Sequence, residues 1–256
     1  MTELVYVYGV AATGSRVVTP GINGQPIRWI DEGQLAAAVS DVPAEEFDEE
    51  PLNAGLTDMN WLGPRAIAHQ DVNQQLHEQS EALIPLAFGT VFRDDERVRA
   101  LLRDQAAALG ERLKRVRGRS EWVVAVQRVG PPDLGASAPL RALRAEIDAA
   151  TPGRAHLLRR RLVELERDET RRLEAESVDG ALATLGAVSD EVFVEPLPSD
   201  VVDRPLVRVS VLVRRSEEDR FVDAVDALQS GSLRMLVTGP WPPYRFGGLE
   251  HAAATR

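Results

Sequence analysis

The sequence predicts an α+β protein of two domains, the second of them ferredoxin-like. Three observations lead to this prediction. The chain has 256 residues and is 44% hydrophobic, enough for two domains with their own cores. An apolar run near residue 85 closes a strand-rich first part. From residue 121 onward, the strand-like and helix-like segments follow the order β-α-β-β-α-β, which is the split βαβ order of ferredoxin-like folds.

These observations also suggest domain boundaries. We expect a smaller N-terminal α+β domain over residues 1–93 and a connecting helix over residues 94–120. The ferredoxin-like domain is expected over residues 121–246, with a long helical insertion at about residues 139–185. Residues 247–256 are expected to form a flexible tail.

The first part opens with three short runs typical of strands, at residues 4–8, 27–30 and 35–39. The stretch from Asp41 to Asp58 carries seven acids and no base. It is expected to be a solvated loop, with an acidic surface that faces a partner as the alternative.

A helix is expected next, over residues 62–81, with Leu62, Ile67, Val72 and Leu76 on its apolar side. The apolar run at residues 82–92 then predicts a buried strand. Its Pro85 would lie at a strand start, an edge or a bulge.

Acids at Asp94 and Asp95 suit the positive end of a helix that Gly118 ends. Thr151-Pro152 is typical of a helix start, so the long helical stretch from residue 140 is expected to be two helices. The apolar side of the second helix either covers a sheet or leaves a groove for a partner helix. The strands and the last helix of this part are expected at residues 122–126, 192–196, 206–213, 218–228 (the helix) and 233–238.

Composition argues against several classes of protein. The formal charge of −10 does not suit a general nucleic-acid binder. No apolar run approaches eighteen residues, and the first residues lack the features of a signal peptide, so membrane insertion is not expected. The absence of cysteine excludes disulfides and thiol catalysis and fits a reducing compartment. We therefore expect a soluble, cytoplasmic protein.

No catalytic, cofactor or metal site is predicted. The stretch from Gly9 to Arg16 follows a strand but lacks the lysine of a phosphate-binding loop. The four histidines, His69, His77, His156 and His251, lack metal-ligand spacing and are expected on the surface. Paired carboxylates lie in loops or at helix starts, where solubility and capping explain them. An enzyme is not expected.

The segment TGPWPPYRF, residues 238–246, is the most unusual in the chain because it combines three prolines with three aromatic side chains. Such a segment forms a stiff apolar surface, and Trp and Tyr are frequent interface anchors. The candidate partner-binding residues are Pro240, Trp241, Pro242, Pro243, Tyr244 and Phe246, together with Pro85 and Phe88 of the central apolar run.

Three segments resemble the gas vesicle protein family GvpF/GvpL. They are Tyr6–Val10, Leu83–Phe92 and the terminal TGPWPPYRF, in the same order as in the family. The central segment is similar to the family signature P-L-x-F-G-T, with Ala87 at the variable position. Residues 153–158 are similar to a further family segment, although His156 stands where tyrosine is expected.

The resemblance implies a two-domain α+β accessory protein of gas vesicles. It implies a role in shell assembly through binding of the small hydrophobic shell protein, GvpA, and contacts with other accessory proteins. Association with the inner shell surface has also been proposed for the family, which is not known to be enzymatic. The alternative is a small-molecule-binding regulatory module or enzyme, because the ferredoxin-like fold hosts many functions.

Two interpretations of the terminal motif remain. Trp241, Tyr244 and Phe246 either fold back and seal the two domains together or stay partly exposed toward a partner. The same alternatives apply to Pro85, Phe88 and Gly89. A deep polar pocket would favour the small-molecule function, and a broad apolar patch would favour the binder.

Overall fold

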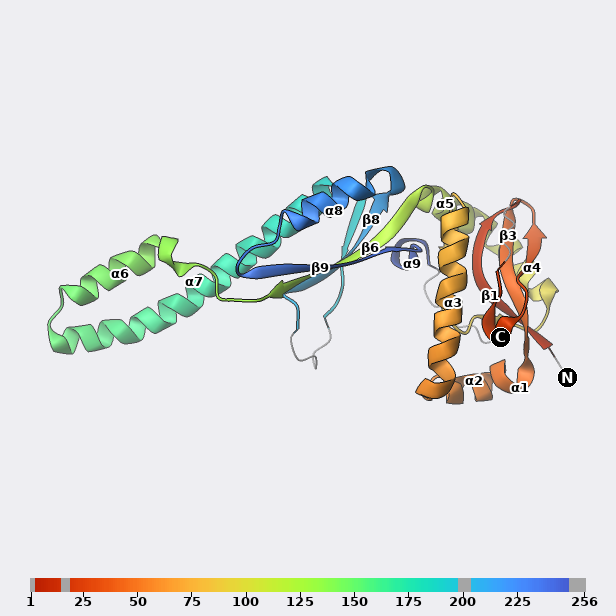
Figure 1. Ribbon diagram of the computed structural model, residues 1–256, viewed down its shortest axis with the longest axis horizontal. Helices are drawn as coiled ribbons and strands as arrows, with labels where there is room; N and C mark the ends of the chain where they lie inside the picture. The colour runs from red at the N-terminus through yellow and green to blue at the C-terminus, as the bar shows by residue number, and fades with distance from the viewer. Residues whose placement is uncertain (1–2, 15–18, 198–203, 249–256) are drawn as a thin grey trace. The chain divides into compact units, whose positions relative to one another are not determined.

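The chain folds into two compact units in a computed structural model that describes residues 3–14, 19–197 and 204–248 (Figure 1). The first unit comprises residues Met1–Trp122 and Gly239–Arg256, and the second comprises Val123–Thr238. These limits differ from the predicted domain boundaries, because residues 94–122 and the terminal aromatic motif from Gly239 onward belong to the first unit. The predicted tail from residue 249 onward lies outside the described residues.

The first unit contains a five-stranded antiparallel sheet. Its strand order is β2-β3-β1-β4, and β5 also pairs with β1. The strands are β1 (Glu3–Ala12), β2 (Arg28–Glu32), β3 (Leu35–Pro43), β4 (Leu83–Pro85) and β5 (Val91–Phe92). The helices are α1 (Ala44–Phe47), α2 (Glu49–Gly55), α3 (Met59–Gln79), α4 (Asp95–Asp104), α5 (Ala106–Val116) and α9 (Tyr244–Gly247), with the short turn η1 (Ile22–Gly24).

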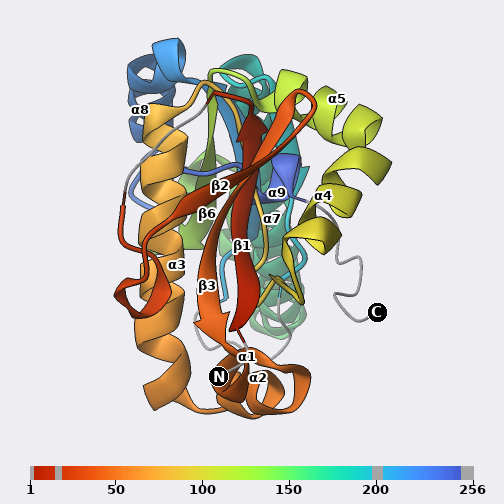
Figure 2. The ribbon, with the colours of Figure 1, turned by 90° about the vertical axis from the view of Figure 1, so that its right-hand side faces the viewer.

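Both faces of β1 are buried, because alternate side chains of a strand point to opposite faces and nearly all of β1 is covered. Tyr6 and Tyr8 belong to a core cluster with Val72 and Leu76 of α3. Figure 2 shows α3 on one side of the sheet and α4 with α5 on the other. The sheet therefore forms the middle layer of this unit.

Several local predictions in this unit were wrong. The acidic stretch from Asp41 to Asp58 is not a loop, since it completes β3 and then forms α1 and α2. Four of its acids, Glu45, Glu46, Glu49 and Glu50, lie in the first turns of these helices, where the helix dipole favours negative charge. Asp48 caps α2 by accepting from the Glu49 N–H. The apolar run at residues 82–92 is two short strands around a turn at Gly89, whose φ is +81°. The single helix expected after Asp94 is divided into α4 and α5 at Gln105.

One arginine ties α4 to the sheet. Arg28 on β2 donates to both oxygens of Asp41 on β3 and to both oxygens of Asp95 at the start of α4, with shortest distances of 2.6 and 2.7 Å. The guanidinium fork matches two carboxylates at once. Because Asp95 lies in the first turn of α4, this ion pair fixes the end of the helix against the β2–β3 hairpin.

The second unit has the ferredoxin-like strand arrangement. Its elements are β6 (Arg119–Arg128), α6 (Ala138–Asp148), α7 (Pro152–Ala187), β7 (Glu191–Val194), β8 (Val207–Arg214), α8 (Glu218–Asp226) and β9 (Leu233–Trp241), with the turns η2 (Leu134–Ala136) and η3 (Arg215–Glu217). The sheet order is β7-β8-β6-β9. Thus β8 lies between the two strands that α7 connects, and β6 lies between the two that α8 connects. This is the split βαβ pattern, as the sequence predicts.

The unit boundary passes through β6 and β9. Residues 119–122 of β6 and 239–241 of β9 belong to the first unit, although both strands are continuous.

The helical insertion consists of two helices, as Thr151-Pro152 predicts. Ser137 caps α6 and also donates from its hydroxyl to Glu169 of α7 at 2.8 Å. Arg144 of α6 donates to Glu166 of α7 at 2.9 Å. The two halves of α7 therefore pack against different elements. Its N-terminal half lies against α6 (Figure 1), and its C-terminal half contacts β7 and α8.

Candidate functional site

The terminal motif packs within the first unit and is only partly exposed. Pro242, Pro243 and Phe246 are buried, and Tyr244 is half-buried. The Phe246 ring lies 5.8 Å from the guanidinium of Arg115 on α5. Pro240 and Trp241 are exposed, with Trp241 at 37%. The motif thus combines a buried anchor with an exposed edge.

Hydrogen bonds hold this anchor to two other elements. The Tyr244 hydroxyl donates to Gln70 Oε1 of α3 at 2.8 Å, and the Arg245 N–H donates to the buried carboxylate of Glu121 at 2.7 Å. Burial raises the pKa of the Tyr244 hydroxyl to about 12, so it remains a neutral donor. Gly239 has φ of +139°, and a Cβ there would lie 2.9 Å from the Trp122 ring. Only glycine fits at the point where β9 enters the motif.

The second predicted segment, from Pro85 to Thr90, lies beside the first. Pro85 is buried at the end of β4, opposite Gly9 of β1. Phe88 is half-buried and makes edge contacts with Tyr6, Trp61 and His69. A Cβ on Gly247 of α9 would lie 3.6 Å from the Leu83 carbonyl oxygen of β4, so α9 and β4 are in contact. The structure therefore brings both segments together in one unit.

A buried polar network lies under this segment. The Tyr6 hydroxyl accepts from the Gly89 N–H at 3.0 Å and bonds to His69 Nδ1 at 2.9 Å, and the Asn73 amide bonds to His69 Nε2 at 2.9 Å. Burial lowers the pKa of His69 to about 4 and raises the pKa of Tyr6. The network thus holds the Gly89 turn against α3 with both rings neutral.

The expectation of surface histidines was wrong for two of the four. His69 and His77 are 4% and 3% exposed, and His77 bonds to Ser120 at 3.1 Å. His156 is exposed, as predicted, and His251 lies outside the described residues. The buried side of α3 consists of His69, Val72, Asn73, Leu76 and His77.

Ile67, predicted on the apolar side of α3, is instead 65% exposed. The sequence does contain a signal for the buried side of α3. His69 lies three residues before Val72, and Asn73 lies three residues before Leu76, so all four share one side of the helix.

The outward side of α3 adds apolar surface near the terminal motif. Met59, Gly63, Ile67 and Gln70 follow at spacings of four, four and three residues, so they share one side of the helix. We call this set the α3 outer face. Met59 is 73% exposed. Because Gln70 bonds to Tyr244, this face leads directly to the terminal motif.

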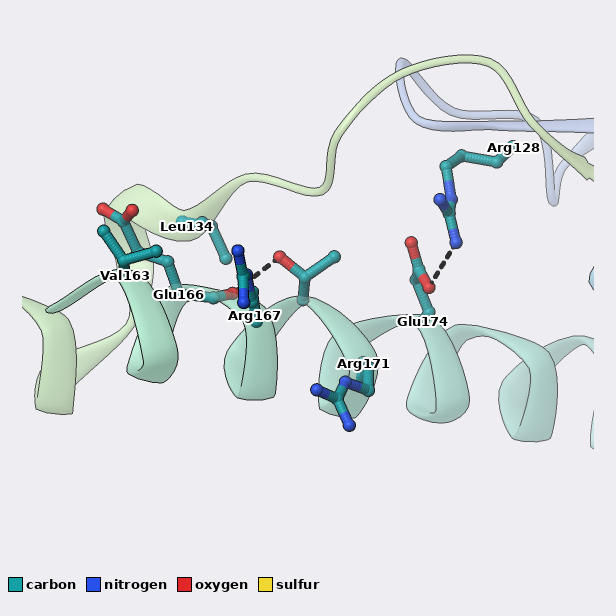
Figure 3. Close-up of a pocket in the computed structure, with 8 residues that line it drawn as sticks. Arg128, Leu134, Val163, Glu166, Arg167, Arg171 and Glu174 are labelled. Carbon is teal, nitrogen blue, oxygen red and sulfur yellow. Dashed lines mark hydrogen bonds and ion pairs between the residues drawn. The ribbon is translucent and has the colours of Figure 1, made fainter. Parts of the chain in front are cut away.

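An open cleft in the second unit does not resemble a catalytic site (Figure 3). Its lining residues are Arg128, Leu134, Val163, Glu166, Arg167, Thr170, Arg171 and Glu174. Arg128 donates to Glu174 at 2.6 Å, and Thr170 donates to the Glu166 carbonyl at 2.7 Å. Figure 3 shows Arg171 pointing away from the cleft. Arg128 and Glu174 pair with each other, and the charged side chains are spread along the cleft rather than converging on a common point.

Residues 3–14, 19–197 and 204–248, which the structure describes, contain neither a cluster of metal ligands nor a helix suited to cross a membrane. No group of three or more His, Cys, Asp or Glu side chains in these ranges could hold a metal ion. No helix within them is both long enough and apolar enough to cross a membrane.

Comparison with known families decides the identity of the chain. The family model described as "Gas vesicle synthesis protein GvpL/GvpF" matches residues 4–247. The chain belongs to the gas vesicle GvpL/GvpF family. Its relatives include gas vesicle protein L of Streptomyces sp. (strain CB03234), 34% identical over 96% of this chain and 94% of the relative. Gas vesicle protein F of the same strain is 30% identical over 94% and 98%. These relatives are named as gas vesicle proteins, not as enzymes.

Solved GvpF structures have the same fold. The crystal structure of gas vesicle protein GvpF from Anabaena sp. PCC7120 matches with a TM-score of 0.69 and 20% identity, over 97% of this chain and 98% of that chain. GvpF from Microcystis aeruginosa matches with a TM-score of 0.67 and 19% identity, over 96% and 99%. The two-unit α+β architecture is therefore a fold of the GvpL/GvpF family.

Proposed function

We propose that this chain is a non-catalytic assembly factor that binds the small hydrophobic shell protein, GvpA, through its first unit. The family match over residues 4–247 carries the proposal, because it links the chain to gas vesicles over nearly its whole length. In this role the protein acts in the cytoplasm together with other gas vesicle proteins. Association with the inner surface of the shell is part of the same proposal.

The exposed apolar groups of the first unit support this binding surface. Trp241 and Pro240 are exposed above the buried anchor, and the α3 outer face adds Met59 and Ile67. A shell subunit that has not yet assembled exposes apolar surface, and a rigid apolar partner covers it at a low cost in ordering. Phe246, Pro242, Pro243 and Pro85 would act indirectly, by holding this surface in place.

Co-expression with GvpA tests the proposal. We expect the wild-type chain to keep GvpA in the soluble fraction and to co-purify with it. Trp241→Ala and Ile67→Ser should each reduce the co-purified GvpA several-fold, since truncating an interface anchor costs on the order of 1–2 kcal/mol. Leu157→Ser in the second unit is the matched control, because Leu157 and Ile67 are equally exposed at 65%.

The outcomes separate binding from folding. Each variant is first checked by circular dichroism and thermal unfolding. A folded Trp241→Ala variant that no longer retains GvpA supports the first unit as the binding surface. Equal retention by all variants would place binding elsewhere. A wild-type chain that does not associate with GvpA, alone or with other accessory gas vesicle proteins, would refute the proposed function.

A further inference from the structure

The outer edge of β7, in the second unit, presents backbone groups that no other described residue pairs with. β7 is the first strand in the sheet order, and among the residues that the structure describes it pairs with β8 alone. Phe193 lies opposite Ser210 in the antiparallel register, and the Glu195 N–H donates to the Arg208 carbonyl at 2.8 Å. In an antiparallel pair, only every second residue bonds to the neighbouring strand. Residues 191, 193 and 195 therefore face β8, and the N–H and C=O groups of Val192 and Val194 point outward.

These outward groups form a short template for another strand. Within the described parts of the chain, nothing bonds to the outward backbone groups of Val192 and Val194. The side chains along the edge are apolar and accessible, with Phe193 at 39% and Val194 at 52% exposed. An extended strand of another protein can hydrogen-bond to these N–H and C=O groups, because its own donors and acceptors repeat at the same spacing.

Charge decides which strand fits. The edge reads Glu191-Val192-Phe193-Val194-Glu195, with a carboxylate two residues to each side of Phe193 and on the same face. Glu195 accepts from the Ser210 hydroxyl at 2.8 Å, which fixes its carboxylate over this face.

A second copy of this chain would be a poor partner. Paired antiparallel about Phe193, it would place each Glu191 opposite a Glu195, and like charges directly opposite each other destabilise a strand pair. A partner strand with an apolar centre and Lys or Arg two residues to each side would place opposite charges there instead.

We propose that the β7 edge binds an extended segment of another protein by antiparallel strand addition, and that this segment carries basic residues four positions apart around an apolar centre. The site is independent of the proposed GvpA surface, which lies in the first unit. It gives this acidic chain a means to select partners with basic strands and to exclude its own copies.

A labelled peptide with the core Arg-Val-Tyr-Val-Arg tests the proposal on the full-length protein by fluorescence anisotropy. We expect saturable binding, and roughly tenfold weaker binding for the same peptide with Glu in place of both Arg, because two opposite-charge pairs become like-charge pairs. Glu191→Lys should reduce or reverse the preference for the Arg peptide over the Glu peptide. Equal binding of the two peptides to the wild-type chain would refute the proposed selection of basic strands by Glu191 and Glu195.

Val194→Pro and Val194→Thr form a matched pair that tests whether the partner bonds to the outward backbone groups of β7. Proline removes only the outward N–H, which makes no bond to β8, whereas threonine keeps it. We expect Val194→Pro to weaken binding by about tenfold or more relative to Val194→Thr, since it blocks the central backbone bonds. Equal affinities would refute strand addition.

Two further measurements keep the test decisive if the proline variant does not fold. In the wild-type chain, bound peptide should slow amide hydrogen exchange at Val192 and Val194, and unchanged exchange would refute the site. Sedimentation of the protein alone should show no dimer that depends on β7. A dimer that Val194→Thr retains and Val194→Pro loses would show that the edge takes its own copy, and would overturn the choice of partner. The absence of any peptide binding at millimolar concentration would refute the proposal as a whole.

Discussion

His69 shows how a single buried residue connects the family signature to the core. It sits between Tyr6 of β1 and Asn73 of α3, and the Tyr6 hydroxyl in turn accepts from the Gly89 N–H. Histidine is intermediate between the buried and the exposed residue types, so its residue type gave no indication of this role. Its place on the side of α3 that carries Val72 and Leu76 did.

His69 should make the stability of the first unit depend on pH. Its pKa is lowered to about 4 in the folded chain, from an ordinary value of 6.5. Below pH 6.5 the unfolded chain takes up a proton that the folded chain does not, so stability falls as the pH drops from about 7 to about 4. The loss from this residue is about 3 kcal/mol. His69→Gln should have a flatter dependence, measured by urea unfolding at pH 7, 5.5 and 4.5.

The exposed His156 provides the control for this measurement. His156→Gln should keep the wild-type pH dependence, because His156 is exposed and lies outside the buried network of Tyr6, His69 and Asn73. If His69→Gln and His156→Gln have the same slope as the wild type, His69 is not the group responsible.

At the scale of elements, the agreement between sequence and structure follows the strength of the local signal. The second unit has alternating strand and helix patterns with clear starts, such as Thr151-Pro152, and its order was predicted. The helices of the acidic stretch and the buried side of α3 were not predicted, because both depend on tertiary packing rather than on an apolar period. In α3 the buried side carries His69, Asn73 and His77, so polar residues fill the positions where a pattern search expects apolar ones.

The docking of α4 gives a prediction at this scale. Arg28→Lys keeps the positive charge but cannot bond to Asp41 and Asp95 with two nitrogens each. The site is partly exposed, with Arg28 at 35%, so we expect a loss of only about 1 kcal/mol in the free energy of unfolding. Urea unfolding of the two proteins measures it. Arg103→Lys, at the more exposed pair with Glu32, should change stability by less. A larger effect at Arg103 would contradict the role given to Arg28.

At the scale of the whole molecule, the first unit is built from two separate parts of the chain. Residues 239–248 complete it from the far end of the sequence, through Phe246, Tyr244 and the Arg112 bond to the Gly248 carbonyl. The sequence placed this motif in the second domain because neighbours in sequence usually share a domain. Its contacts place it in the first unit, among them those of Tyr244 with Gln70 and of Arg245 with Glu121.

Truncation after the second unit should therefore destabilise the first unit, although most of the first unit lies far from the truncation point in sequence. A chain ending at Thr238 loses the burial of Phe246, Pro242 and Pro243, and we expect it to lose more than about 3 kcal/mol of stability or to become insoluble. A chain ending at Gly248 keeps all the contacts described above and should match the full-length protein. Thermal unfolding compares the three. Equal stability of all three chains would show that the terminal motif is not part of the first core.

Because the first unit is built from two separate parts of the chain, the two units can complete their folding at different times during translation. Residues 123–238 leave the ribosome before the motif that completes the first unit, so the second unit can finish folding while the first still lacks Tyr244 and Phe246. Until residues 244–247 have been synthesised, α5 and β4 lack the contacts that α9 makes with them. Of the surface that we propose for GvpA, Trp241 is therefore made after the α3 outer face and after the second unit. A nascent chain without residues 239–248 would therefore offer a shell subunit an incomplete surface.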